Sequence, residues 1–357
     1  MESGKISIIL PVYNSEEFIK RTLDSLITQT YKNIEILCIN DGSSDNSLNI
    51  LNEYSKKDNR IKIFSQANSG PAKARNTGLA NATGEYLMFC DSDDYYEPDM
   101  VEVMTKAITE HDVDFVMCEA KVVVQQDKYD ISRTQGTITY HRNLINKNGI
   151  IELDLEKKYQ MNVLLWNKIF KANIIKKYGI LFPNGFECDD NFFIYEYMLI
   201  AKKYYAVKKK LYNYSIRRNS IMDLFYKRIS TKHLYDKIKI HKFLFEFLIR
   251  NNYLITKNNK LLYLSIITRN FKRSFIYDCK TPQEKETAKE IISDLVETTK
   301  DKIKYPKIFY KLDKISNQSL ENYFKHNSIE SIVLGQKYKI KEIMQKLRKT
   351  ILLIKMV

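Results

Sequence analysis

The sequence predicts an α/β protein in which a mostly parallel sheet, flanked by helices, precedes a largely helical C-terminal region. In residues 1–119, short apolar runs alternate with amphipathic helical patterns at a spacing typical of strand–helix–strand units. From about residue 225 the pattern is helical, with Lys, Tyr, Phe, Ile and Leu interleaved and few Gly or Pro. The composition shifts near Met222, so we expect one domain over residues 1–222 and a basic helical region over 223–357.

Five apolar runs are the predicted strands of the first domain. They are Ile6–Leu10, Ile34–Ile39, Ile61–Phe64, Glu85–Cys90 and Asp114–Cys118. Ligands bind at the carboxyl ends of the strands in parallel sheets of this kind. Polar residues stand at those ends: Asn14 after the first run, Asp41 after the second and residues 91–94 after the fourth.

Capping signals and apolar spacing predict helices between these strands. The expected helices cover about 15–29, about 44–56, a segment that begins at Pro71, and Met100–His111. Asn14 and Glu17 are the predicted capping pair of the first helix. Pro71 suits the first turn of the third helix, because its missing N–H needs no partner there.

Composition excludes several classes of protein. The chain has 357 residues, of which 44% are hydrophobic and 28% charged, with 10 Gly and 6 Pro, so collagen-like and low-complexity proteins are excluded. The sequence has no run of about 18 apolar residues that would predict a transmembrane helix, and its first residues lack the pattern of a secretory signal. The five Cys are scattered without C-x-x-C spacing. We therefore expect a cytoplasmic protein with reduced thiols and neither a zinc cluster nor a disulfide framework.

The net charge of +15 is unevenly distributed. Residues 1–119 carry 11 Lys+Arg and 20 Asp+Glu, a net charge of −9. Residues 120–199 have a net charge of +2 and residues 200–357 one of +22. Such a basic region suits an anionic surface, or is a solvated Lys-rich surface. We expect no nucleic-acid partner, because no recognisable module combines clustered Lys and Arg with stacking aromatic residues.

The final segment, Lys337–Val357, has the spacing of a basic amphipathic helix. Apolar residues recur every three or four positions from Ile340 to Ile354, and Lys and Arg lie off that stripe. Two interpretations remain open. The helix could bind an anionic membrane surface and make the protein peripheral on the inner face of the cell membrane. It could instead pack on the rest of the chain or form a homo-oligomer contact.

Three carboxylates, Asp91, Asp93 and Asp94, follow the fourth predicted strand within four residues. Carboxylates two residues apart beyond a strand end can converge on a hard cation, and Mg²⁺ and Mn²⁺ often complete their shells with substrate phosphates. An acidic turn that caps the next helix is the alternative. A haloacid-dehalogenase-type phosphatase is disfavoured, since these residues lie behind three strand–helix units and precede two tyrosines.

Blocks of sequence that stand in the expected order resemble glycosyltransferase family 2. They are Pro11–Asn14, Asn40–Asp45, Asn68–Gly78, Asp91–Asp94, Trp166–Lys171, Gly179–Pro183, Asp189–Phe193 and Leu211–Ser220. The resemblance covers about residues 5–222. It implies a GT-A fold with a nucleotide-binding half over 1–119 and an acceptor-binding half over 120–222. It also implies inverting transfer from a nucleotide-sugar donor, with Mn²⁺ or Mg²⁺ as cofactor.

The resemblance assigns donor contacts to one set of residues. They are Pro11, Val12, Tyr13, Asn14, Asp41, Asn68, Arg75, Asp91, Ser92, Arg217, Arg218 and Ser220. The backbone of the first block would flank the base, with Tyr13 as a stacking face, and Asp41 would accept the N3–H of uracil unless it caps the next helix. Arg75 would reach the diphosphate, or form a surface ion pair. Asp91 would hold the ribose or donor sugar, and Asp93 would bind the metal.

Asp190 is the expected catalytic base. In inverting transfer the acceptor hydroxyl loses its proton as it attacks, and a positioned carboxylate can take it without a covalent intermediate. Asp189 stands where the family usually has Glu and is expected to contact the acceptor; Glu187 and Asp189 are the alternative bases. Trp166 either lines the acceptor site or anchors the core, and Lys168 is equally ambiguous.

One departure from the family pattern concerns the metal. Some relatives have a His where this chain has Asn219 and Ser220, so the third protein ligand is open. The function we expect is sugar transfer to a hydroxyl of a bacterial surface glycan, such as a capsule or lipopolysaccharide, or of a lipid-linked saccharide. The alternatives are a GT-A-like nucleotide-sugar-binding protein without transferase activity and a basic membrane or nucleic-acid adaptor.

Overall fold

The computed structural model describes residues 2–124, 148–153, 163–218, 220–226, 230–255, 259, 263 and 278–303. The chain divides into two compact units. The first consists of Met1–Asp236 with Glu246–Asn251, and the second of Lys237–Phe245 with Asn252–Val357. The domain boundary that we expect near Met222 stays a prediction.

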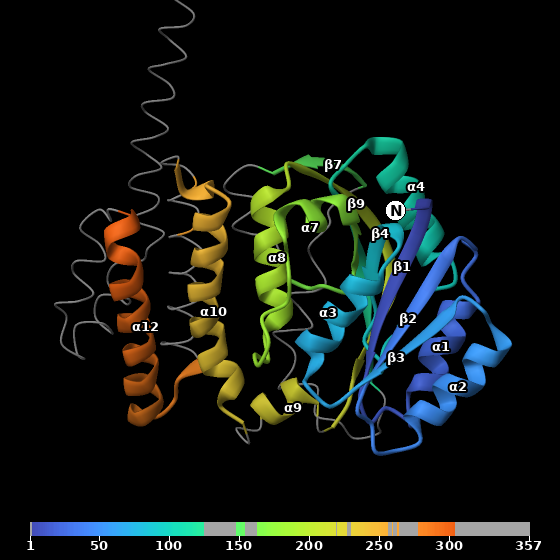
Figure 1. Cartoon of the computed structure of the whole chain (residues 1–357), viewed down its shortest axis with the longest axis horizontal. Helices are drawn as coiled ribbons and strands as arrows, with labels where there is room; N and C mark the ends of the chain where they lie inside the picture. The colour runs from blue at the N-terminus through green and yellow to red at the C-terminus, as the bar shows by residue number, and fades with distance from the viewer. Residues whose placement is uncertain are drawn as a thin grey trace, which may run out of the picture. The chain divides into compact units, whose positions relative to one another are not determined.

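Nine strands in the described part of the first unit form one sheet (Figure 1). They are β1 (Glu2–Val12), β2 (Ile34–Asp41), β3 (Ile61–Gln66), β4 (Gly84–Phe89), β5 (Tyr95–Tyr96), β6 (Phe115–Val124), β7 (Gly149–Glu152), β8 (Lys168–Lys171) and β9 (Lys203–Ile216). Their order is β3-β2-β1-β4-β8-β6-β9-β5, and β7 pairs with β9. Each of the five predicted strands lies within one of these or extends it by a residue.

Strand directions confirm the prediction of a mostly parallel sheet. β3, β2, β1 and β4 pair in parallel, with Ile8 opposite Ile36 on one side and Met88 on the other. β8 is antiparallel to β4 and β6, and β6 pairs in parallel with the long β9. Because β1, β2 and β4 run in one direction, their carboxyl ends share one edge of the sheet. The loops at that edge carry most of the predicted site residues.

Helices cover both faces of the sheet. Those of the first unit are α1 (Ile19–Ile27), α2 (Ser47–Lys57), α3 (Pro71–Asn81), α4 (Met100–His111), α7 (Ala172–Tyr178), α8 (Asp189–Ile200) and α9 (Ile221–Tyr226). Figure 1 shows α1 and α2 on one side of β1–β3 and α3 on the other. The helix α10 (Lys232–Arg250) contributes residues to both units.

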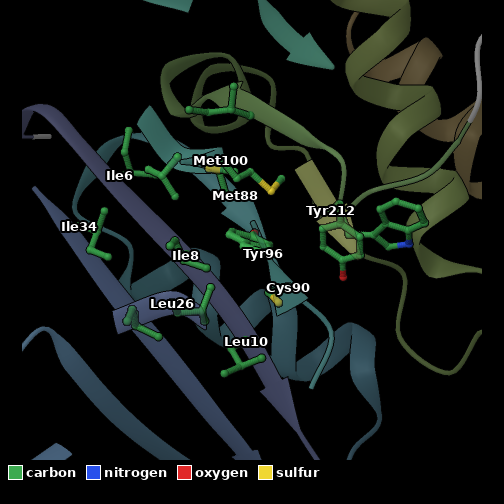
Figure 2. Close-up of a cluster of buried hydrophobic side chains, with 14 of the residues drawn as sticks. Ile6, Ile8, Leu10, Leu26, Ile34, Met88, Cys90, Tyr96, Met100 and Tyr212 are labelled. Carbon is green, nitrogen blue, oxygen red and sulfur yellow. The ribbon is translucent and has the colours of Figure 1, made fainter. Parts of the chain in front are cut away.

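A hydrophobic cluster lies on the α1 and α4 face. Alternate residues of β1, Ile6, Ile8 and Leu10, are fully buried there with Leu26 of α1 and Met100 of α4. Figure 2 shows these side chains gathered on one side of the sheet. This alternation follows from the period of two in a strand, which sends successive side chains to opposite faces.

The opposite face requires a small residue in α3. A Cβ at Gly78 would lie 2.5 Å from Ile9 Cγ2 and 3.1 Å from Ile39 Cδ1. The absence of a side chain therefore lets α3 approach β1 and β2 closely. This close approach fixes the position of Arg75, which lies one turn before Gly78 on the same helix.

An aromatic cluster packs α8 against the same face. Phe89 of β4 makes edge-to-face contacts with Phe170, Phe182 and Phe193, at centroid distances of 5.5 to 6.0 Å. Phe182 and Phe193 stack at 4.3 Å. Aromatic packing of this kind is rigid, so the first turn of α8 has a fixed position relative to β4.

The first helix begins later than its sequence signals predict. α1 starts at Ile19 after Phe18, whose side chain makes no capping hydrogen bond. Asn14 has φ 45°, and its side-chain oxygen accepts hydrogen bonds from Ser44 instead. The predicted capping pair of Asn14 and Glu17 is therefore wrong, because a long-range contact takes the Asn14 side chain.

The described residues of the second unit are helical, as predicted. α12 (Pro282–Ile303) and α10 are linked by an ion pair between Lys242 and Asp294 at 3.5 Å, and the short 3₁₀ helix η2 (Tyr253–Ile255) follows α10. In the described ranges no helix is both long and apolar enough to cross a bilayer. The predicted basic helix Lys337–Val357 lies outside the described residues, so its membrane or oligomer role stays a prediction, as does a cytoplasmic location.

Candidate active site

The loops after β1 and β2 are joined by hydrogen bonds at the carboxyl edge. The Asn14 N–H donates to Ser43 Oγ (3.1 Å), and Asn14 Oδ1 accepts from the Ser44 N–H (2.9 Å). Val12 is fully buried and Pro11 half-buried, whereas the Tyr13 ring is 51% exposed. An exposed aromatic ring beside strand ends is available for stacking on a base. The exposed ring of Tyr13 is compatible with its predicted role as a stacking face. The side chain of Val12 is buried, so this residue could contact a ligand only through its backbone.

Asp41 holds the loop that precedes α3. Its Oδ1 accepts from Gln66 Nε2 (2.7 Å) and the Ser69 N–H (2.9 Å), and its Oδ2 accepts from the Gly70 N–H (2.8 Å). The side chain is 3% exposed. Asp41 is therefore no cap for α2, and its predicted contact with uracil would add to these three bonds. Asn68, in the same loop, is exposed and its backbone lies against Gly42.

Two residues of the acidic segment after β4, Asp94 and Ser92, make hydrogen bonds to other parts of the chain, and the predicted donor contact of Ser92 stays a prediction. Asp94 is 1% exposed, and its carboxylate accepts from the Tyr212 hydroxyl (2.6 Å) and the Ser215 N–H (2.7 Å). Burial, together with the charges of Asp93 and Asp91, raises its pKa. Ser92 exchanges a hydrogen bond with Ser15 Oγ at 2.6 Å. These bonds fix the segment against β9 and the β1 loop, and thereby orient Asp91 and Asp93.

Asp93 forms an ion pair with Arg217 at the end of β9. Arg217 Nε donates to Asp93 Oδ2 at 2.5 Å, and its guanidinium lies 5.2 Å from the centre of the Phe18 ring. Arg21 of α1 donates to the backbone oxygen of Asp93 (2.8 Å). Burial raises the pKa of Asp93, and Arg217 opposes that effect. Arg21 was not expected from the sequence, since nothing in its local pattern distinguishes it from other exposed residues of an amphipathic helix.

Arg75 connects two carboxylates. Its Nη1 donates to Asp189 Oδ2 (2.7 Å) and its Nη2 donates to Asp91 Oδ1 (3.0 Å). The residue is 8% exposed, and its guanidinium lies 5.6 Å from the Phe182 ring centre. Burial disfavours the Arg75 charge, but Asp189, Asp91 and Asp190 outweigh it and raise its pKa. The alternative of a surface ion pair is therefore wrong.

Asp190 is the second residue of α8 and lies next to this cluster. The residue is half-buried, and its Oδ1 accepts from the Asn191 N–H (2.8 Å). Burial and the charge of Asp189 raise the pKa of Asp190 to about 7, against the opposing effect of Arg75. Burial likewise raises the pKa of Asp189, which is 3% exposed. A carboxyl with a pKa near 7 can accept and release a proton at neutral pH.

Glu187 has different surroundings. Its carboxyl lies near Lys232 and Asp236 of α10, and its pKa is raised by burial, lowered by Lys232 and raised by Asp236. None of the interactions that set its pKa comes from Arg75 or Asp190. Of the three candidate bases, only Asp189 and Asp190 lie with Arg75, and Asp189 is already bound by it.

Trp166 lies in the core. It is 5% exposed and stacks on Tyr212 and Tyr214 at centroid distances of 4.3 and 5.3 Å. The residue belongs to the hydrophobic cluster of the α1 and α4 face. The structure therefore favours the core alternative over direct contact with an acceptor.

Lys168, whose role the sequence does not decide, is a buried amine. It is 1% exposed, and its Nζ donates hydrogen bonds to the backbone oxygen of Leu164 and to Asn167 Oδ1. Burial lowers its pKa to about 7, and the charges of Cys118 and Asp190 oppose this shift. No local sequence signal indicates such a shift, because it depends on the burial of Lys168 at the start of β8, where that strand pairs with β6.

Arg218 and Ser220 are the last residues of the predicted donor site. Arg218 is exposed, and Ser220 Oγ accepts from the Asp223 N–H (3.1 Å) in the first turn of α9. Asn219 lies outside the described residues. The structure thus brings Asp91, Arg75, Asp189 and Asp190 together, and places Asp93 with Arg217, whereas Arg218 and Ser220 join neither group.

The described carboxylates at this edge could hold a divalent cation that the donor also binds. They do not form a site in which protein side chains alone would hold the cation. Within the described ranges, no group of three or more His, Cys, Asp or Glu side chains could hold a metal ion. Asp91 and Asp93 supply two carboxylates, two residues apart, and each pairs with an arginine. Mg²⁺ and Mn²⁺ commonly bind through one or two carboxylates when phosphates and water complete the shell.

Comparison with known proteins identifies the family. Residues 7–174 match the family model described as "Glycosyl transferase family 2". The glycosyltransferase GlyA of Streptococcus pneumoniae is 36% identical over 61% of this chain and 31% of its own length. The uncharacterized glycosyltransferase YibD of Escherichia coli is 31% identical over 62% of this chain and 64% of its own length. The chain belongs to glycosyltransferase family 2. It spans less than two thirds of the length of either relative.

Solved structures confirm the fold. Staphylococcus aureus TarS, residues 1–349 in complex with UDP-GlcNAc, has a TM-score of 0.67 and 23% identity, and the match covers 84% of this chain and 82% of that one. A mannosyltransferase of Pyrobaculum calidifontis in complex with GDP-Man and Mn²⁺ has a TM-score of 0.50 and 14% identity, over 96% and 84%. At these identities the likeness shows the fold alone. It agrees with the expected GT-A architecture of the family 2 chain.

Proposed function

We propose that this family 2 chain is an inverting glycosyltransferase that moves a sugar from a nucleotide-sugar, a UDP-sugar, to a hydroxyl of a bacterial surface glycan or lipid-linked saccharide. The cluster of Asp190, Asp189, Arg75 and Asp91 is the observation that carries the proposal. It places a carboxyl with a pKa of about 7 at the carboxyl edge of the sheet, beside the acidic segment that follows β4. The nucleotide-sugar in the TarS structure supports the donor class.

Asp190 acts as the general base in this proposal. Its carboxylate takes the proton of the acceptor hydroxyl while the acceptor oxygen attacks the anomeric carbon of the donor. The bond from that carbon to the diphosphate oxygen breaks as the new glycosidic bond forms, and the nucleoside diphosphate leaves with the bonding electrons. Asp189 is held by Arg75 and keeps Asp190 in place, because the two residues are adjacent in the first turn of α8.

The leaving diphosphate must meet positive charge as it departs. Asp91 and Asp93 would hold a divalent cation together with the diphosphate, and such a cation, when bound, supplies positive charge to the leaving group. Arg217 now pairs with Asp93 and lies within reach of the same region. Tyr13 would stack on the base, and Asp41 would keep the loop before α3 in position.

Substitution of Asp190 tests the proposal directly. Asp190→Asn keeps the size of the side chain but cannot accept the proton, so we expect transfer to fall by about 10²-fold or more while UDP affinity stays near that of the parent. Transfer from UDP-GlcNAc and a panel of other UDP- and GDP-sugars to soluble p-nitrophenyl glycosides would be measured by UDP or GDP release.

Glu187→Gln is the matched control, since it neutralises a nearby carboxyl that lies with Lys232 instead of Arg75. Normal transfer by Asp190→Asn together with loss of transfer in Glu187→Gln would assign the base to Glu187. Nucleotide-sugar binding without transfer by the parent chain, with every donor and acceptor in the panel, would favour a binding protein over an enzyme.

A further inference from the structure

The loop that leads into α8 is held by the beginning of α10. The Glu187 N–H donates to Asp236 Oδ2 at 2.9 Å, and Lys232 Nζ donates to the backbone oxygen of Gly185. The Lys232 ammonium also lies 5.8 Å from the ring centre of Phe186. Three consecutive loop residues are therefore each in contact with one of two side chains on α10. All of these residues belong to the first compact unit.

Asp236 and Lys232 support each other in this contact. They are one helical turn apart and form an ion pair, in which Lys232 Nζ donates to the same Asp236 Oδ2 that accepts from Glu187. Asp236 is 4% exposed, so little solvent competes for its carboxylate. Hydrogen bonds to a buried charged acceptor are stronger than neutral ones. The ion pair of Lys232 and Asp236 therefore holds residues 185–187, whose backbone is irregular, against α10.

The loop itself has an irregular backbone. Gly185 has φ 85°, in the region that favours glycine, and a Cβ there would meet no atom within 4 Å. Cys188 precedes α8 without a side-chain capping bond. The bond to Asp236 lies only three residues before Asp190, so a shift of the Glu187 backbone would be transmitted to the first turn of α8.

We propose that Asp236 and Lys232 are positioning residues, which hold residues 185–187 and thereby set the place of Asp190 relative to the acceptor hydroxyl. The inference rests on the proposed function, since it assigns these residues a part in the same reaction. They would act through the loop, without touching substrate. A displacement of about 1 Å in a reacting group can cost about 10²-fold in rate, which sets the size of the expected effect.

Two substitutions of Asp236 separate the hydrogen bond from the charge. Asp236→Ala removes the acceptor of the Glu187 N–H. Asp236→Asn keeps a side-chain oxygen that can accept it but loses the ion pair with Lys232. Lys242→Ala is the control, because it removes an ion pair from the same helix, at 3.5 Å to Asp294, without a contact to this loop. Thermal melting of all variants would check that the fold is kept.

The first measurement is hydrogen–deuterium exchange of the peptide that covers residues 184–191, which needs neither donor nor acceptor. We expect faster exchange in Asp236→Ala, an intermediate rate in Asp236→Asn and the parent rate in Lys242→Ala. The second is steady-state transfer from UDP-GlcNAc to a p-nitrophenyl glycoside. We expect Asp236→Ala to lower kcat by about 10- to 100-fold and to raise the KM of the acceptor, with UDP affinity by calorimetry within about twofold of the parent.

Parent-like exchange in Asp236→Ala, or a parent-like kcat and acceptor KM despite faster exchange, would overturn the inference. Equal losses of UDP affinity and acceptor affinity would also overturn it, because they would indicate a general structural role. If Asp236→Ala does not fold, Asp236→Asn and Lys232→Met decide by the same readouts. Failure of the parent chain to transfer any sugar would refute the proposed function instead, and the exchange data would remain a separate test of the contact.

Discussion

Removal of Arg75 should destabilise the protein in a pH-dependent way. In Arg75→Met the carboxylate of Asp189 loses its partner at 2.7 Å while it stays buried, with 4% of its side chain exposed. Loss of one partner of a buried ion pair costs about 3–5 kcal/mol. The Asp91 contact adds little, because that side chain is 32% exposed and solvent screens the pair.

Protonation of Asp189 limits this cost. Neutralising a carboxyl with an ordinary pKa of about 3.9 costs about 4 kcal/mol at pH 7 and about 1.5 kcal/mol at pH 5. The folded-state pKa of Asp189 in the variant would lie above its unfolded value, so the folded state binds a proton that unfolding releases, and stability rises as the pH falls. Because burial already raises the pKa of Asp189 in the parent, these figures are upper limits: we expect a loss of up to about 4 kcal/mol at pH 7 that shrinks to at most about 1.5 kcal/mol at pH 5.

Urea unfolding of the parent and of Arg75→Met at both pH values measures this loss. Asp189→Asn added to Arg75→Met should recover much of the stability at pH 7, since it removes the unpaired charge. Lys106→Met is the control, because its pair with Glu110 at 3.8 Å is exposed on both sides, and it should cost under about 1 kcal/mol. A loss below about 1 kcal/mol at pH 7, or one of the same size at pH 5, would refute the reasoning.

Three further predictions concern other parts of the first unit. Hydrogen bonds from Lys62, Ser7 and Thr83 outweigh burial and lower the pKa of Glu35 to about 2, so the folded pKa lies below the unfolded value of about 4.3. Glu35 should then contribute up to about 3 kcal/mol above pH 5 that is lost as the pH falls toward 2. The difference in unfolding free energy between the parent and Glu35→Gln should therefore become smaller as the pH falls from 5 toward 2. A difference that stays constant over this pH range would contradict the prediction. Gly78→Ala should lower the free energy of unfolding in urea by about 1–2 kcal/mol. The reason is that overpacking against Ile9 outweighs the gain in helix propensity of about 1 kcal/mol. A variant more stable than the parent would show instead that α3 can shift. Asp93→Ala should weaken Mn²⁺ binding in the presence of UDP by about 10-fold or more, as measured by calorimetry, and full transfer in EDTA would show that no metal is needed.

The strands could be predicted from the sequence because burial acts on each apolar run separately. Ile6–Leu10 and Ile34–Ile39 lie within β1 and β2, which are buried on both faces and therefore read as continuous apolar runs. The start of α1 could not be predicted in the same way. Asn14 could cap its own helix or bond Ser44, which is 30 residues away, and only the folded chain decides between the two.

The sequence pattern predicts Arg75, Asp91, Asp189 and Asp190 as separate site residues, but it does not predict the contacts among them. Arg75 is bound to Asp91 and Asp189, which are 16 and 114 residues away. No local pattern indicates that one guanidinium joins residues so far apart in the chain. The lowered pKa of Lys168 and the core position of Trp166 likewise depend on packing between distant strands.

Charge at the carboxyl edge supports the proposal that an anionic donor binds there together with a cation. Four carboxylates belong to the two groups there: Asp91, Asp93, Asp189 and Asp190. Two guanidinium groups, those of Arg75 and Arg217, pair with them. If all six side chains are ionised their sum is −2, and it is −1 when Asp190 is neutral. A diphosphate would add further negative charge to this region, where low solvent access strengthens repulsion. A divalent cation bound with the donor would offset that charge, and Arg217 could then pair with a phosphate oxygen instead of Asp93. We therefore infer that donor and cation would bind together, with Asp91 and Asp93 as the protein ligands.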